Sequence, residues 1–301
     1  MPYKLRFNLA VLLCYFSLTA CSKKETPVVD HPRLAPAVKM WDVSFYSAAL
    51  QRTMPYRVVL PADYKPGEKF PVIYLLHGGG ENFRSWTNDS DVAQYAGQGI
   101  IFVMPEGNSS YYVNSARNPQ DRYEDYIVKD LVADVERRFP AATTRQGRAV
   151  VGVSMGGFGA IVLALKHPDL FVFAGALSPA LDVPSRPFSI KRISQWRHHR
   201  SIFGDWNGQH QRENDPYFLA RAADPAKVPY IWFSCGDQEG LLPANARFAQ
   251  LLNLRGFRFH FSKEHGGHNW NQWNALVSGV IADALPAIYE TPSPRSQISL
   301  H

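Results

Sequence analysis

Hydrophobic residues along this chain gather into short apolar runs and longer amphipathic stretches. Residues 70–76 and 99–104 are almost continuously apolar, which is typical of parallel strands covered on both faces of a sheet. In residues 123–139, apolar and charged positions separate onto two faces of a helix. This alternation predicts an α/β fold, with a mostly parallel central sheet and helices on both faces. Further strands are predicted at residues 148–151, 173–177, 229–234 and 258–262, and further helices at 157–166, 244–255 and 270–289.

Two segments depart from this alternation. Residues 43–46 and 54–60 are strand-like and bounded by turn residues, which predicts an edge hairpin. Residues 182–223 follow a strand end and predict an insertion over the carboxyl edge of the sheet, either a lid or acyl-group wall or a solvated basic surface. A metal site is not expected there, because no carboxylate or cysteine stands at ligand spacing from its histidines. The insertion interleaves Arg186, Lys191, Arg192, Arg197, His198, His199, Arg200 and His210 with Phe188, Trp196, Phe203 and Trp206.

The first twenty residues predict an export signal. Lys4 and Arg6 precede an apolar run over residues 7–18, which is typical of a signal peptide and too short to span a bilayer. The ending Leu-Thr-Ala before Cys21 resembles the lipobox of bacterial lipoproteins, so Cys21 is the predicted lipidated N-terminus. An ordinary secretory signal cleaved after Ala20 is the alternative. We expect an envelope protein on the periplasmic face, with the outer membrane favoured by Ser22.

The remaining segments and the composition set the domain organisation. Proline-rich residues 21–40 predict a flexible tether, residues 41–290 one domain, and residues 291–301 a disordered tail. A chain of 301 residues with 46% hydrophobic content can bury one large core. The net charge is +6, or +4 without the two basic signal residues, and this mild excess argues against a nucleic-acid binder. With Cys14 removed and Cys21 acylated, Cys235 has no disulfide partner.

A serine flanked by glycines stands between a predicted strand and a predicted helix. Gly152, Ser154 and Gly156 follow the run 148–151 and precede the helix 157–166. At such a junction the chain turns so tightly that side chains on the flanking residues would collide with the strand and the helix. The turn exposes the hydroxyl at the end of the sheet and directs backbone N–H groups at an oxyanion. The pattern predicts Ser154 as a nucleophile, with a buried helix-capping serine as the alternative.

A serine nucleophile needs a histidine base and a carboxylate that holds the tautomer of that base. In this architecture the order along the chain is serine, then Asp or Glu, then histidine, each after a strand. Asp237 and His268 fall at these places and are the predicted partners. Glu239 stands just beyond the same strand end, and His265 competes with His268. Two glycines between the histidines favour His268, because they would let the loop swing the later ring inward.

The loop after residues 70–76 supplies the other half of the predicted site. His77 and three glycines follow this strand, and we predict an oxyanion hole from the backbone N–H groups of Gly79 and Met155. His77 is expected to hold this loop. Candidate pocket residues are the aromatic side chains Trp86, Tyr111, Tyr112 and Trp270, with packing in the core as the alternative.

Several motifs occur together in this chain. They are residues 75–80 with Trp86 downstream, 123–127, 152–160, 167–171 and 267–270. Together they resemble the esterase D family, which includes S-formylglutathione hydrolases, feruloyl and acetylxylan esterases, tributyrin-type esterases and mycolyltransferases. The resemblance covers roughly residues 42–285 and implies an α/β-hydrolase fold, no cofactor, and a triad on Ser154, Asp237 and His268. Glu106, where relatives often carry aspartate, and the insertion depart from the pattern and leave the substrate open.

These observations predict a lipid-anchored serine carboxylesterase that forms an acyl-enzyme on Ser154. Its expected partners are a small-molecule or glycan ester and a membrane, with no metal, cofactor or nucleic acid. Three alternatives stay open. An acyltransferase would pass the acyl group to a sugar or lipid alcohol, and a thioesterase would resemble S-formylglutathione hydrolase. A non-catalytic envelope binding protein would keep the scaffold alone.

Overall fold

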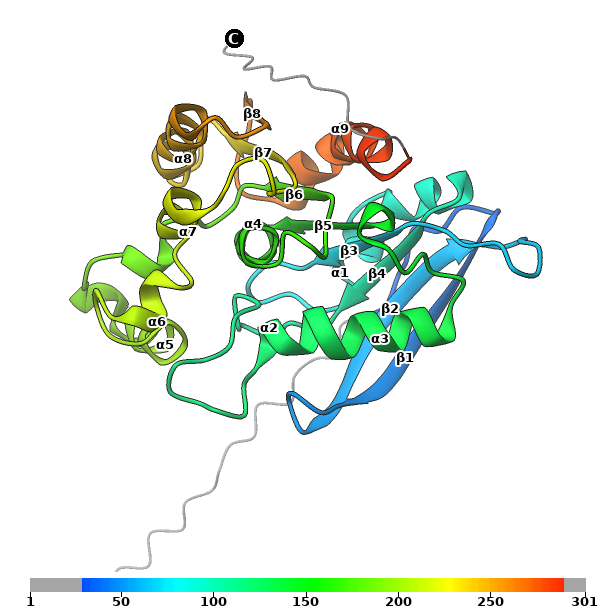
Figure 1. Cartoon of the computed structure of the whole chain (residues 1–301), viewed down its shortest axis with the longest axis horizontal. Helices are drawn as coiled ribbons and strands as arrows, with labels where there is room; N and C mark the ends of the chain where they lie inside the picture. Colours follow the sequence, from blue (N-terminus) through cyan, green and yellow to red (C-terminus); the bar gives the residue numbers. More distant parts are fainter. Residues whose placement is uncertain (1–28, 290–301) are drawn as a thin grey trace, which may run out of the picture. The chain divides into compact units, whose positions relative to one another are not determined.

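An eight-stranded sheet forms the centre of residues 29–289, the part of the chain that this computed structural model describes (Figure 1). The strand order is β1-β2-β4-β3-β5-β6-β7-β8. β1 and β2 form an antiparallel hairpin at one edge, β2 is antiparallel to β4, and all further neighbours are parallel. This confirms the predicted mostly parallel sheet. The strands are β1 (Val38–Ser47), β2 (Arg52–Pro61), β3 (Val72–Leu76), β4 (Ile101–Pro105), β5 (Arg148–Val153), β6 (Phe173–Leu177), β7 (Tyr230–Gly236) and β8 (Phe259–Glu264).

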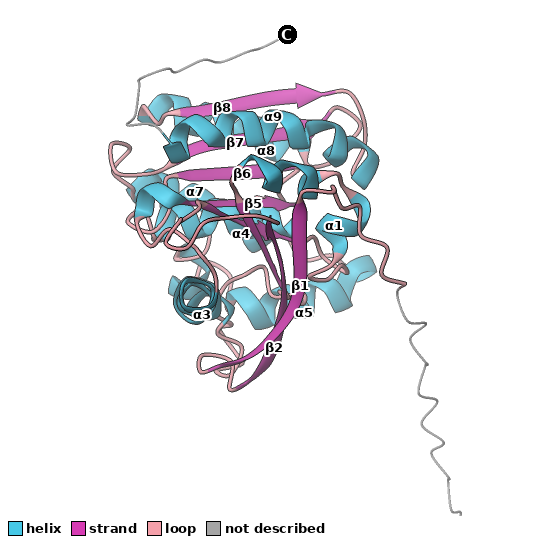
Figure 2. Ribbon diagram, turned by 90° about the vertical axis from the view of Figure 1, so that its right-hand side faces the viewer, coloured by secondary structure: helices cyan, strands magenta, loops and turns pink. Residues whose placement is uncertain are grey.

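Helices cover both faces of this sheet. α3, α4, α7 and α8 pack on one face, and α1 and α9 pack on the other. Figure 2 shows β5 to β8 side by side, with the β1–β2 hairpin turned steeply away from them, as sheet twist requires. The helices are α1 (Ser85–Asp89), α2 (Tyr123–Asp125), α3 (Val132–Arg138), α4 (Met155–Lys166), α5 (Ile193–Phe203), α6 (Gln209–Arg212), α7 (Pro216–Ala222), α8 (Leu242–Arg255) and α9 (Trp270–Tyr289), with a π-helical turn at Tyr126–Leu131 and 3₁₀ turns at Val92–Gln98, Arg145–Gly147, Val183–Ser185 and Ile190–Arg192.

The central strands are buried on both faces, which explains their continuous apolar runs. Every residue of β3, β4 and β5 is buried. Successive side chains in a strand point to opposite faces, so Tyr74 packs in the cluster that includes Leu163 of α4, and Ile73 packs in the cluster that includes Val277 of α9. The sheet therefore lies between two layers of helices and packs against both.

The predicted tether is wrong at its C-terminal end. β1 begins at Val38, which pairs with Pro61 of β2, and Val38 and Met40 pack against the core. The N–H of Arg33 also donates to the carbonyl of Thr87 at 2.8 Å. Apolar burial thus extends the hairpin into the proline-rich segment. The predicted signal peptide, Cys21 and the tail lie outside the described residues.

The insertion, residues 182–223, has two parts. α5 and α6 stand away from the sheet, whereas α7 packs with α4 and α8 as an ordinary crossover helix (Figure 1). Ala220 of α7 is fully buried in the apolar cluster that includes Ile161 of α4, and the Tyr217 hydroxyl donates to the carbonyl of Ala244 at 2.7 Å. The lid-like part therefore ends before α7. Within residues 29–289 no helix combines the length and apolar character that a membrane crossing requires.

Candidate active site

Ser154 occupies a strained turn between β5 and α4. Its backbone has φ 53° and ψ −111°, a conformation that non-glycine residues rarely adopt and that is common at functional sites. A Cβ on Gly152 would overlap the backbone of Gly156, and one on Gly156 would overlap the carbonyl of Leu76. The sequence argument for glycine at both positions is therefore confirmed sterically.

This overlap predicts a large stability effect for Gly152→Ala. We expect the variant to lose about 3 kcal/mol or more of its free energy of unfolding, because backbone atoms cannot move aside as a side chain can. Gly279→Ala is the matched control, since a Cβ there meets nothing within 4 Å on α9, and alanine favours a helix by about 0.5–1 kcal/mol. Urea denaturation gives the free energy of unfolding of both variants. Equal stability of Gly152→Ala and the wild type would contradict the steric argument.

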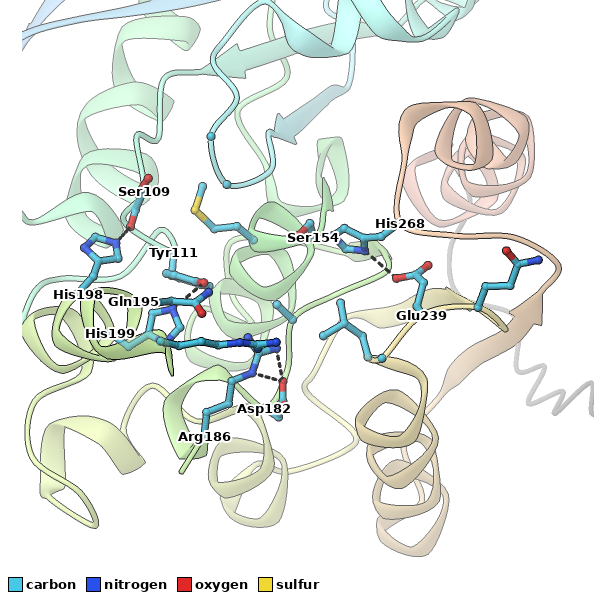
Figure 3. Close-up of a pocket in the computed structure, with 18 residues that line it drawn as sticks. Ser109, Tyr111, Ser154, Asp182, Arg186, Gln195, His198, His199, Glu239 and His268 are labelled. Atoms are coloured by element: carbon cyan, nitrogen blue, oxygen red, sulfur yellow. Dashed lines mark hydrogen bonds and ion pairs between the residues drawn. The ribbon is translucent and has the colours of Figure 1, made fainter. Parts of the chain in front are cut away.

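His268 lies beside Ser154 on the loop between β8 and α9. Its Nε2 is 2.8 Å from Ser154 Oγ, so the hydroxyl can donate to the ring (Figure 3). The indole of Trp273 packs edge-on against the imidazole, with ring centroids 5.0 Å apart. His265 points elsewhere, and its side chain is 85% exposed. The structure thus brings together the serine and the later histidine, as predicted.

The carboxylate partner of His268 is Glu239. Nδ1 of His268 is 2.7 Å from Glu239 Oε2, and the glutamate side chain is 1% exposed (Figure 3). Its other oxygen, Oε1, accepts from the Ser178 hydroxyl at 2.6 Å and from the Gly236 N–H at 2.8 Å. Burial raises the pKa of Glu239, but hydrogen bonds from His268, Ser178 and Gly236 outweigh it and leave the pKa below its ordinary value. The carboxylate is therefore charged at neutral pH.

The prediction of Asp237 in this place is wrong. Asp237 accepts from His265 Nδ1 at 3.1 Å and from the Gly266 N–H at 3.0 Å, on the surface. These two interactions, the Gly266 N–H first, lower the pKa of Asp237. A turn explains the difference, because the Glu239 N–H bonds back to the carbonyl of Gly236 at 3.2 Å. That turn directs the third residue after the strand, rather than the first, towards His268.

Gly79 and Met155 meet at the same cavity as Ser154. Both line it, and a Cβ on Gly79 would lie 4.0 Å from the Met155 Cβ. Met155 is the first residue of α4, and N–H groups in the first turn of a helix have no acceptor within it. Among the described residues the Gly79 N–H has no acceptor either. Two N–H groups are therefore free beside the serine.

A cavity of about 870 Å³ opens in front of Ser154. Of the four predicted pocket aromatics, Tyr111 lines this cavity (Figure 3). The other three do not line it, and each donates a hydrogen bond to a neighbouring segment instead. Trp86 Nε1 donates to the Leu76 carbonyl at 3.1 Å, the Tyr112 hydroxyl donates to the His77 carbonyl at 3.1 Å, and Trp270 Nε1 donates to Glu81 Oε1 at 2.8 Å. The sequence did not predict Glu239 as the hydrogen-bond partner of His268, and it did not point to Ser178 or Glu81 as residues of the site.

The fold and this site define a class of protein. A serine on a strand-to-helix turn of a mostly parallel sheet, joined through histidine to a buried carboxylate, is the arrangement of an α/β-hydrolase with a serine nucleophile. The family model Esterase, described as "Putative esterase", matches residues 47–283. The chain belongs to this family, and it is a carboxylic ester hydrolase.

The chain is similar to both esterases and acyltransferases. An acetyl esterase of Caldicellulosiruptor saccharolyticus is 25% identical over 255 residues, which cover 79% of this chain and 95% of the relative. The Diacylglycerol acyltransferase/mycolyltransferase Ag85A of Mycobacterium gordonae is 28% identical over 261 residues, covering 75% of this chain and 76% of the relative. Among solved structures, a ferulic acid esterase superposes with a TM-score of 0.72 at 24% identity, covering 83% of this chain and 98% of the other; this likeness shows the fold.

Proposed function

We propose that the protein hydrolyses carboxylic esters through an acyl-enzyme on Ser154. One observation carries the proposal. The hydroxyl of Ser154, the ring of His268 and the buried carboxylate of Glu239 are hydrogen-bonded in series at 2.8 and 2.7 Å. That series ends at the mouth of a cavity large enough for a small ester.

The first half of the proposed reaction transfers the acyl group to the enzyme. Ser154 Oγ attacks the ester carbonyl while His268 Nε2 takes its proton. The carbonyl oxygen becomes an oxyanion, which the N–H groups of Gly79 and Met155 stabilise. The C–O bond to the alcohol then breaks, and His268 returns the proton to the leaving oxygen. Glu239 holds Nδ1–H throughout and stabilises the charged ring.

The second half releases the acid. Water replaces the alcohol beside His268, gives a proton to Nε2 and attacks the acyl carbonyl. The same two N–H groups stabilise the second oxyanion. When the bond to Ser154 Oγ breaks, His268 protonates the serine, and the enzyme is restored.

The test of this function uses purified protein and chromogenic esters. We expect turnover of p-nitrophenyl acetate or butyrate, and stoichiometric labelling of Ser154 by a fluorophosphonate, detected as a mass shift on the peptide that contains it. A screen of acetylated-sugar, feruloylated, short-chain and long-chain esters then ranks substrates by kcat/KM. Failure of both turnover and labelling would refute the proposal.

Acyl transfer is the second candidate, because a relative at 28% identity is named as an acyltransferase. The chemistry differs only in the second half, where an alcohol instead of water attacks the acyl-enzyme. Product analysis in the presence of glycerol or a disaccharide separates the two outcomes. Free acid as the main product supports hydrolysis, and a new ester as the main product supports transfer.

Glu81 is a positioning residue for the proposed oxyanion loop. Its Oε2 accepts from the Gly78 N–H at 2.8 Å, and its Oε1 accepts from Trp270 Nε1, two residues beyond His268. One carboxylate therefore joins the loop of Gly79 to the loop of the base. Glu81→Gln presents an amide N–H to one of these donors, and a buried unsatisfied donor costs about 1–3 kcal/mol.

We expect Glu81→Gln to lower kcat about tenfold with little change in KM, because this side chain does not line the cavity. Glu213→Gln is the control, since Glu213 is exposed beside α6. Initial rates over a range of p-nitrophenyl acetate concentrations give both constants. An unchanged kcat, or a change confined to KM, would contradict a positioning role.

We also propose that the protein is lipid-anchored at Cys21 in the bacterial envelope. The support is the basic start, the apolar run and the small residues before Cys21. In bacterial cells, wild-type protein should sediment with membranes, and Cys21→Ala should remain in the supernatant. The same distribution for both would refute the anchor and leave the enzymatic proposal intact.

A further inference from the structure

The insertion gives the active-site cavity an unusual wall. Small-molecule sites are mostly apolar, with a few placed polar groups. Here every insertion residue that lines the cavity is polar or charged, and Figure 3 shows labelled members of this set lying across the cavity from Ser154, His268 and Glu239. The set is Asp182, Arg186, Arg192, Gln195, His198 and His199.

Most of these groups already have partners. Arg186 Nη2 and Nε donate to Asp182 Oδ1 at 2.7 and 3.1 Å (Figure 3). The negative charge of Asp182 therefore compensates the positive charge of Arg186. Burial, with Arg186 and His198 nearby, lowers the pKa of His199 to about 4. His199 is therefore neutral at pH 7, and its Nε2 contacts the Tyr111 hydroxyl at 3.1 Å. His198 Nε2 contacts the Ser109 carbonyl at 2.8 Å.

Arg192 and Gln195 differ from the other insertion residues that line the cavity. Within residues 29–289, Arg192 forms no ion pair and the Gln195 side chain forms no hydrogen bond. Both are exposed, and they line this cavity and a smaller one next to it. Glu239, the other carboxylate at the cavity, is buried and already bonded to His268. The wall thus presents one uncompensated guanidinium beside an amide with free donors. The N–H groups of a guanidinium can bind two oxygens of one carboxylate or phosphate at the same time.

We propose that the cavity binds esters whose non-reacting part carries an anionic group, a carboxylate or a phosphate, held by Arg192 and Gln195. This inference rests on the proposed esterase function and names its substrate class. The charged group sits against the insertion while the ester carbonyl lies at Ser154. Arg192 is then a specificity-determining residue, which acts on substrate choice and leaves the bond-breaking steps to the triad.

Matched esters test this inference on both sides of the ester bond. On the acyl side, mono-p-nitrophenyl glutarate is compared with its methyl ester. On the alcohol side, 4-acetoxybenzoate is compared with methyl 4-acetoxybenzoate. The measured quantity is the ratio of kcat/KM for the anionic member to that for the neutral member. We expect Arg192→Gln to lower this ratio about tenfold in at least one pair, because it removes a charged hydrogen-bond donor. The pair that responds shows which side of the ester carries the anion.

Arg197→Gln is the matched control. Arg197 is exposed on α5, the helix that begins directly after Arg192, but it does not line the cavity, so the ratio should stay unchanged. Equal effects of Arg192→Gln on both members of both pairs would overturn the proposal. Vesicles of phosphatidylglycerol provide a further arm. If Arg192→Gln weakens sedimentation with these vesicles but leaves both ratios unchanged, Arg192 serves a lipid surface instead, and the proposal is wrong. If the wild type cleaves none of the four esters but still turns over p-nitrophenyl acetate, the substrate-class proposal is wrong. If it turns over neither and Ser154 takes no fluorophosphonate label, the esterase proposal itself fails.

Discussion

Replacement of Ser154 by alanine should lower kcat for p-nitrophenyl esters by about 10⁶, the loss seen when a triad serine is removed. Without Oγ no acyl-enzyme forms, and the remaining N–H groups act on an uncatalysed attack by water. The fold should persist, because alanine meets the same backbone strain at φ 53° as serine does. The side chain loses only its hydrogen bond to His268.

Three measurements make this result decisive. Initial rates give kcat, circular dichroism and thermal unfolding report the fold, and a fluorophosphonate reports the nucleophile. The variant should show wild-type spectra and no label. Labelling of Ser154→Ala at another serine, with retained turnover, would assign the nucleophile elsewhere. An unfolded variant would instead be replaced by Ser154→Gly, which tolerates the positive φ without strain.

Much of the fold is predictable from the sequence, because strands that are buried on both faces appear as continuous apolar runs. The apolar runs at 70–76 and 148–151 coincide with β3 (Val72–Leu76) and β5 (Arg148–Val153), and residues 173–177 coincide with β6. The tether boundary is less visible. Val38 and Met40 join the sheet only because Pro61 and Val59 lie opposite them, and a pairing between distant residues leaves no local signal.

The turn that carries Ser154 is also predictable from the sequence, since a side chain at Gly152 or Gly156 would overlap backbone atoms. The aromatic side chains are not. A buried Trp86 that bonds the Leu76 carbonyl and a Tyr111 that faces the cavity look alike in sequence. They differ in what each ring contacts in the folded chain, and only tertiary packing determines that.

The choice between Asp237 and Glu239 shows the same limit at finer scale. Both follow β7 within three residues, and both can orient a histidine. The turn from Gly236 to Glu239 and the pocket made by Ser178 decide between them. A glutamate that lies three residues past a strand end, after a glycine, is the signal that could have directed attention to this position. Chain order alone does not resolve a separation of two residues.

Glu239→Gln should lower kcat by about 10⁴, as the corresponding amide substitution does in other triads. The reason is a conflict of hydrogen bonds. His268 Nδ1–H, the Gly236 N–H and the Ser178 hydroxyl all donate to the two carboxylate oxygens. A glutamine has one oxygen, so its amide N–H₂ must face at least one donor, or His268 must take the wrong tautomer. The charge that stabilises the protonated ring is also lost.

Asp237→Asn is the matched control and the discriminating variant. It removes a carboxylate of the same strand end, but one that pairs with an exposed His265, and exposed pairs contribute about 0–1 kcal/mol. We expect kcat within about threefold of the wild type, against a loss of about four orders of magnitude for Glu239→Gln. Steady-state rates with p-nitrophenyl acetate measure both. If Asp237→Asn causes the larger loss, the loop rearranges during catalysis and Asp237 replaces Glu239 beside His268.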